Sequence, residues 1–151
     1  MKAVIQRSEE ASVTVDEKIT GKISKGIVIL IGVNQSDTEK DAEYLAEKIA
    51  NLRLFESEEK EFNTSILENS KEALVISQFT LYANTKKGRR PDFAEAAKSD
   101  TAKPLYEHFC EELKNKGIKI EKGVFGAMMK VKLTNSGPVT IILESKENNQ
   151  K

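Results

Sequence analysis

Residues 74–83 read Leu-Val-Ile-Ser-Gln-Phe-Thr-Leu-Tyr-Ala, an apolar run that becomes polar in its middle. The run begins with aliphatic side chains suited to a buried strand. Ser77, Gln78 and Thr80 then place three hydrogen-bonding side chains within four positions. Unpaired polar groups are costly to bury, so a core strand would not continue through them. We therefore expect a central strand over residues 73–77 that ends at a polar site.

A second stretch, residues 134–143, reads Thr-Asn-Ser-Gly-Pro-Val-Thr-Ile-Ile-Leu. Its Gly137-Pro138 pair separates two segments that both have the composition of strands. An X-Pro bond is the only kind with a realistic chance of being cis, although only about 5–6% of such bonds are. Taken alone, the stretch therefore favours an ordinary turn with a trans bond.

The periodicity of the remaining sequence predicts many short strands and two helices. Ser36–Glu39 has a capping-box pattern, and a helix should follow it with an apolar face of Ala42, Leu45, Ala46, Ile49 and Leu52. A second helix is expected over residues 102–116, with Pro104 in its first turn and a buried stripe of Tyr106, Phe109, Cys110 and Leu113. Strands are expected at residues 3–6, 12–15, 19–23, 26–33, 52–55, 73–77, 118–121, 130–134 and 139–144.

This pattern predicts an α/β fold with mixed, largely antiparallel β-sheets and two helices packed on one side. The chain has 151 residues, the length of one domain. We expect that single domain to span residues 1–145 and residues 146–151 to form a disordered tail.

The composition limits the classes of partner. Lys and Arg together number 24, and Asp and Glu together also number 24, so any contact with nucleic acid requires a local basic patch. No stretch approaches the ~20 apolar residues that a membrane-spanning helix needs. The first residues pass directly into strand-like sequence, which leaves no room for a signal peptide. The single cysteine suits a reducing compartment, so we expect a cytoplasmic protein that binds neither membrane nor DNA.

Several kinds of chemistry lack the residues that they need. His108 is the one histidine and lies off the apolar stripe of the second helix, so we expect an ordinary surface residue there. Cys110 lies in the stripe and is expected to be a buried structural thiol. One cysteine and one histidine cannot form a usual structural zinc site, and neither a P-loop nor a dinucleotide-binding glycine motif is present. We therefore expect no metal and no cofactor.

Several short motifs, taken together, resemble the D-aminoacyl-tRNA deacylase family, which edits tRNA charged with an amino acid of the wrong handedness. The motifs are Ile5–Arg7, Ala11–Val15, Ser77–Leu81, Gly88–Phe93, Gly123–Met129 and Asn135–Thr140. They follow one another in order over nearly the whole chain. The resemblance implies a three-layer fold that forms a homodimer with its active sites at the interface, and a hydrolase acting on aminoacyl-tRNA.

The resemblance implies that the catalytic site consists of Ser77, Gln78, Phe79 and Thr80. An aminoacyl ester is reactive, and the neighbouring ribose 2′-hydroxyl of the terminal adenosine can assist its hydrolysis. The protein would then supply positioning and backbone N–H donors, those of Phe79 and Thr80, for the developing oxyanion. A covalent role for the Thr80 hydroxyl is the alternative, although no activating base is visible in the sequence.

The resemblance also assigns substrate-binding residues. Phe125 and Met129 match the part of the family pattern that lines the pocket, although plain core packing would explain them equally well. Gly137 and Pro138 would form a cis pair inserted into the partner's pocket, where rigid carbonyls exclude L-amino acids. Glycyl-tRNA has no side chain to exclude and should also be hydrolysed. Arg7 is a candidate for bracing the site.

The basic segment Lys86, Lys87, Arg89 and Arg90 follows closely after the expected catalytic residues. Such a run is usually a solvated loop, but beside the site it would hold phosphates of the tRNA acceptor end. Two other hypotheses remain open. One is a non-catalytic tRNA-binding module on the same scaffold, and the other is a general esterase that acts on small esters without tRNA.

Overall fold

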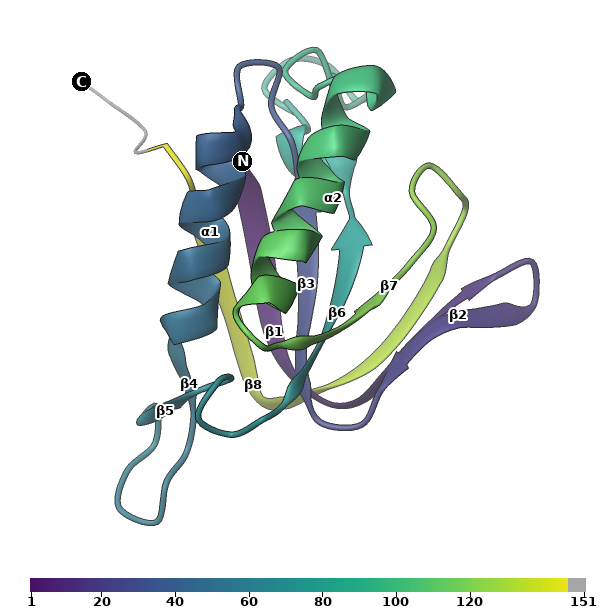
Figure 1. Cartoon of the computed structure of the whole chain (residues 1–151). Coiled ribbons are helices and arrows are strands. Elements are labelled where there is room, and N and C mark those ends of the chain that lie inside the picture. Colours follow the sequence, from purple (N-terminus) through teal and green to yellow (C-terminus); the bar gives the residue numbers. More distant parts are fainter. Residues whose placement is uncertain (147–151) are drawn as a thin grey trace.

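The computed structural model describes residues 1–146, and a six-stranded bent sheet forms its centre (Figure 1). The long strand β1 (Lys2–Val15) is paired along both edges. The other strands of this sheet are β2 (Lys18–Ile23), β3 (Gly26–Gly32), β6 (Glu72–Ser77), β7 (Lys119–Lys122) and β8 (Lys130–Glu144). β4 (Arg53–Phe55) and β5 (Thr64–Ser65) form a separate two-stranded ribbon.

The sheet combines antiparallel and parallel pairs, as the sequence predicted. β1 pairs in antiparallel fashion with β2, β3 and β8, whereas β3 and β6, and β6 and β7, are parallel. The central strand predicted over residues 73–77 is β6, which begins one residue earlier. Its last residue, Ser77, lies opposite Ile31 of β3. The polar stretch after Ser77 therefore starts at the carboxyl end of a buried parallel strand.

Two helices, α1 (Glu39–Asn51) and α2 (Ser99–Asn115), lie side by side on one face of the sheet (Figure 1). The prediction of two helices on one side is confirmed. Between helices and sheet lies the larger core cluster, which includes Ile27, Ile29, Ile31, Leu45, Ile49, Ala73, Val75, Tyr106 and Phe109. A smaller cluster of Ala11, Val13, Ile23, Val28, Leu74 and Ile76 covers the other face. Successive residues of β3 and β6 point alternately into the two clusters, so both strands are buried on both faces and have nearly continuous apolar sequences.

Both helix starts differ from the prediction. The residue that caps α1 is Thr38, and the Asp41 carboxylate accepts hydrogen bonds from the Thr38 N–H group (2.8 Å) and hydroxyl (3.1 Å). The capping pair predicted at Ser36 and Glu39 is therefore wrong by two residues. α2 begins at Ser99 rather than at residue 102 because the Lys98 carbonyl accepts from the N–H group of Ala102 at 2.8 Å. Pro104 consequently lies in the second turn of α2 and not in the first.

The chain ends of the described region meet at the start of α1. The Met1 ammonium lies 2.8 Å from the buried Asp37 carboxylate, and the Ser145 hydroxyl donates to Asp41 at 2.7 Å. Lys146, the first residue of the expected tail, lies 3.3 Å from Asp37. The rest of that expected tail, residues 147–151, is outside the described residues. No helix in residues 1–146 combines the length and the apolar character needed to cross a membrane.

Candidate active site

A cavity of about 620 Å³ opens at the carboxyl end of β6. Ser77, Gln78 and Phe79 line it on one side, and Phe125 and Met129 line it from the segment between β7 and β8. The structure therefore brings together five of the eight residues predicted for catalysis and substrate binding. The rest of the cavity is lined by Ile31, Val33, Ile76, Ala97, Lys98, Ser99, Ala102, Tyr106, Gly126, Ala127, Met128 and Val131.

The end of β6 fixes the backbone of the predicted catalytic residues. The Gln78 N–H group donates to the Ile31 carbonyl at 2.8 Å, after which the chain enters the short 3-10 helix η1 (Phe79–Tyr82). The N–H groups of Phe79 and Thr80 donate no hydrogen bond within the described part of the chain. Two adjacent backbone donors are therefore unpaired within residues 1–146, that of Phe79 in the lining of the cavity and that of Thr80 just outside it.

Side chains around this turn are partly exposed. The Gln78 side-chain amide donates to the Thr80 hydroxyl, and Thr80 itself is exposed. The Phe79 ring is 58% exposed and makes an edge contact with Phe93 at 5.0 Å between ring centroids. An amide cannot take a proton from the threonine hydroxyl, so this arrangement orients Thr80 without activating it.

No histidine, cysteine or carboxylate is among the residues that line this cavity within residues 1–146. Its two titratable groups belong to Lys98 and Tyr106. Burial raises the pKa of Tyr106, and its hydroxyl donates to the Val75 carbonyl at 2.9 Å. Burial also raises the pKa of Cys110, one turn further along α2, to about 12. Neither Tyr106 nor Cys110 is therefore placed to act as a base or a thiolate nucleophile near neutral pH.

The four predicted phosphate-binding cations lie on an exposed loop directly after η1. Paired backbone hydrogen bonds between Asn84 and Asp92 close its base, at 2.7 and 2.9 Å. Lys86, Lys87, Arg89 and Arg90 are exposed, and none of them forms an ion pair with another described residue. The loop therefore presents four positive charges that no described carboxylate pairs with, shortly after η1 in the chain.

Gly137 and Pro138 do not line the cavity of their own chain. They are exposed in the middle of β8, their peptide bond is cis, and Gly137 has a φ of 130°. Arg7 holds the preceding residue, because its Nε donates to the Ser136 carbonyl at 2.9 Å. Another Arg7 nitrogen donates to the Leu54 carbonyl at 3.0 Å. Arg7 thus braces this segment and not the cavity.

The contribution of α2 to the cavity is not predictable from the sequence pattern. Lys98, Ser99 and Ala102 line it because α2 starts earlier than predicted and points its first turn at the end of β6. No sequence motif marks these three residues. Tyr106 was predicted as core, and it both packs in the core and lines the cavity.

Comparisons with known proteins agree on one family. The family model described as D-Tyr-tRNA(Tyr) deacylase matches residues 4–144. The D-aminoacyl-tRNA deacylases of Bacillus velezensis and Bacillus mycoides are each 56% identical, over 97% of this chain and 100% of theirs.

Two solved structures have the same fold. One, described as c-Myc DNA Unwinding Element Binding Protein, is 43% identical with a TM-score of 0.90, over 97% of this chain and 99% of its own. The other, described as a probable eukaryotic D-amino acid tRNA deacylase, is 17% identical with a TM-score of 0.84, over 95% of this chain and 98% of its own. The likeness at 17% identity concerns the fold alone. The family model and the close relatives show that this chain belongs to the D-Tyr-tRNA(Tyr) deacylase family, whose members are D-aminoacyl-tRNA deacylases.

Proposed function

We propose that this deacylase hydrolyses the ester of D-aminoacyl-tRNA in the cavity beside η1, without a side-chain general base. The observation that carries the proposal is the combination of two open N–H groups, those of Phe79 and Thr80, with a cavity lined by no carboxylate, histidine or cysteine within the described residues. Such a site can hold an oxyanion, but among residues 1–146 its cavity is lined by no carboxylate, imidazole or thiolate to activate water.

In the proposed reaction, water attacks the ester carbonyl carbon and the carbonyl oxygen becomes an oxyanion. The Phe79 and Thr80 N–H groups stabilise that charge. The bond to the 3′-oxygen of the terminal ribose then breaks, and the free D-amino acid and the tRNA leave. The ribose 2′-hydroxyl lies next to the leaving 3′-oxygen. It assists transfer of a proton from the attacking water to that oxygen, so no titratable group of the protein is required.

Thr80 as a covalent nucleophile is the weaker alternative. Its hydroxyl accepts a hydrogen bond from the Gln78 amide, which cannot serve as a base. A threonine hydroxyl needs such a base to attack an ester. We therefore assign Ser77, Gln78 and Thr80 to positioning the substrate.

The handedness filter is proposed to come from a second copy of the chain. Gly137 and Pro138 are exposed and lie outside the lining of their own cavity, which supports their insertion into the cavity of a partner subunit. Backbone carbonyls set against the substrate Cα would collide with an L side chain and spare a D side chain. Glycine has no side chain to reject, so glycyl-tRNA should also be hydrolysed.

Intersubunit complementation tests this arrangement. Ala127→Trp should obstruct the cavity, and Gly137→Ala should deform the filter, because an added Cβ would lie 2.8 Å from a Val139 methyl and 3.0 Å from an Arg7 nitrogen. The Ala127→Trp homodimer should be nearly inactive, and the Gly137→Ala homodimer should hydrolyse L-tyrosyl-tRNA as well as D-tyrosyl-tRNA. After mixing and re-equilibration, about a quarter of all sites should combine an open cavity with an intact filter, since half of the dimers are mixed and each has one such site. The ratio of D- to L-tyrosyl-tRNA hydrolysis should therefore rise above that of the Gly137→Ala homodimer, and an unchanged ratio in demonstrated mixed dimers would contradict insertion.

Turnover tests the function itself. Substoichiometric protein in EDTA should release many equivalents of D-tyrosine from D-tyrosyl-tRNA, hydrolyse glycyl-tRNA, and leave L-tyrosyl-tRNA intact. Saturable protection of the ester without release would instead support a non-catalytic tRNA-binding module. Hydrolysis of small D-amino acid esters at equal efficiency would support a general esterase.

The basic loop supports tRNA as the partner, and a cytoplasmic location follows from that substrate. The four cations of this loop are exposed, follow η1 closely in the chain, and are free to contact phosphates. Because the name of one structural relative concerns DNA, a competition assay should include duplex DNA beside tRNA. We expect tRNA to compete and DNA of equal charge to compete poorly.

A further inference from the structure

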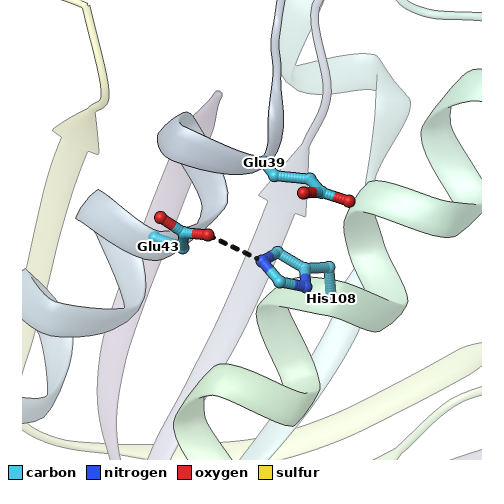
Figure 2. A group of neighbouring side chains, drawn as sticks. All are labelled: Glu39, Glu43 and His108. Carbon is cyan, nitrogen blue, oxygen red and sulfur yellow. Dashed lines mark hydrogen bonds and ion pairs between the residues drawn. The ribbon is translucent and has the colours of Figure 1, made fainter.

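We propose that Glu39, Glu43 and His108 form a binding site for a divalent transition-metal ion, with Zn²⁺ as its best fit, that joins α1 to α2. Figure 2 shows the two carboxylates of α1 turned toward the imidazole of α2. One ligand atom from each residue lies within 4.8 Å of the others. The proposed ion has no part in the hydrolysis described above.

The spacing of the donor atoms suits a small ion. The His108 Nε2 and Glu43 Oε1 atoms are 3.2 Å apart, the distance of a hydrogen bond that a bound ion would replace. Two ligands bound to zinc at about 2.1 Å in tetrahedral geometry are separated by roughly 3.4 Å, so this pair is already spaced for coordination. The exposed Glu39 side chain lies one helical turn before Glu43 on the same face and can close on the ion by rotating.

The charges around the site also favour a cation. Glu43 contacts the His108 imidazole, and neither Glu39 nor Glu43 forms an ion pair with a lysine or arginine among residues 1–146. The next turn of α1 is different, because Glu47 pairs with Lys116 across the same two helices. Two like charges at i and i+4 disfavour a helix unless a positive group lies near. An ion of charge +2 would neutralise both carboxylates.

The donor set indicates the class of metal. One imidazole nitrogen with two carboxylate oxygens suits zinc, cobalt or nickel better than calcium or magnesium, which prefer oxygen alone. Three protein ligands leave at least one position for water. Tyr106 and Ala102, on the same helix as His108, line the cavity, so the ion would fix the helix that supplies one cavity wall.

The single histidine makes the test direct. In protein without a histidine tag, the imidazole proton NMR signals belong to His108 alone. Titration with Zn²⁺ should shift these signals until one equivalent is bound, and Co²⁺ should give the absorption bands of a nitrogen and oxygen site. The melting temperature should rise with excess Zn²⁺.

Variants separate this site from adventitious binding. His108→Ala should abolish the rise in melting temperature, and Glu43→Gln and Glu39→Gln should each weaken Zn²⁺ binding at least about tenfold. The control Glu17→Gln removes an exposed carboxylate that pairs with Lys130 and should leave binding unchanged. Unmoved His108 signals, or equal binding by His108→Ala and wild type, would overturn the proposal. Calorimetry at matched zinc concentrations would quantify each case.

Discussion

The cavity wall and the Gly137–Pro138 segment are held in different ways. The wall residues Ser77–Phe79 continue directly from a strand buried on both faces, so the core fixes their backbone. The Gly137–Pro138 segment is exposed and is held by polar contacts from Arg7 and from Asn135, whose side chain accepts from the Val139 N–H group at 2.8 Å. One region is complete within a single chain, and the other is directed outward. Substitutions should therefore affect the two regions separately.

The largest effect should come from the far end of the β3–β6 strand pair, whose other end carries the cavity wall. A Cβ added to Gly26 would lie 1.7 Å from the Glu72 carbonyl oxygen, so Gly26→Ala must separate β3 from β6. We expect a loss of at least about 3 kcal/mol in the free energy of unfolding, measured in urea.

Gly117→Ala is the matched control for this substitution. Gly117 has a φ of 93°, but an added Cβ meets no atom within 4 Å. Its cost should be about 1 kcal/mol and come from backbone conformation alone. Equal losses in the two variants would contradict the claim that close strand packing holds the cavity wall.

The next largest effect compares the contribution of the substrate's ribose 2′-hydroxyl with that of the Thr80 hydroxyl. D-tyrosyl-tRNA with a 2′-deoxy terminal adenosine should react at least about 100-fold more slowly, because the assisting hydroxyl is gone. Thr80→Ala should lose less than about tenfold, because its hydroxyl only positions the ester. Single-turnover rates measure both. A folded, tRNA-binding Thr80→Ala enzyme with no activity would restore the nucleophilic mechanism.

A smaller effect should follow changes in the basic loop. Lys86→Gln with Arg89→Gln should weaken binding of all tRNAs alike and reduce the slope of log K against log salt by about 1.5. The reaction step at saturating substrate should hardly change. Lys22→Gln with Lys130→Gln, which removes two cations that already pair with Glu10 and Glu17, should leave the slope unchanged. A change confined to one tRNA would argue for sequence readout instead.

The sequence predicted those parts of the site that depend on local chemistry. Ser77, Gln78 and Thr80 interrupt an apolar run, and the structure ends a buried strand at Ser77. The structure also places Phe125 and Met129 in the same cavity. The family resemblance, and not periodicity, pointed to these two residues. The roles of all these residues in catalysis and binding stay predictions.

Other features depend on packing that no local pattern records. Lys98 and Ser99 reach the cavity because α2 extends three residues before its predicted start and aims at the end of β6. This contact joins residues far apart in sequence, so it could not be inferred from neighbouring residues. The cap of α1 is different, because Thr38 and Asp41 form a local capping box whose pattern is present in the sequence three residues apart.

The smallest predicted effect is a pH dependence at the far end of β6. Hydrogen bonds from Lys119 (2.5 Å) and from the Ser24 N–H group (2.8 Å) hold the pKa of Glu72 below its ordinary value of 4.5. The unfolded chain therefore takes up a proton at higher pH than the folded chain. The carboxylate's stabilising contribution is fully present above pH 4.5 and is lost as the pH falls through the lowered folded pKa.

Glu72→Gln should remove this dependence. The difference in unfolding free energy between wild type and Glu72→Gln should be positive at pH 7 and should shrink as the pH approaches 3, measured by urea unfolding across that range. Glu10→Gln, which removes a carboxylate from an exposed ion pair with Lys22, should cost little at pH 7. Glu72 and Ser77 are the first and last residues of β6, so protonation of Glu72 at low pH should also destabilise the cavity wall that begins at Ser77. A difference that stays constant with pH would mean that the Glu72 carboxylate does not stabilise this strand.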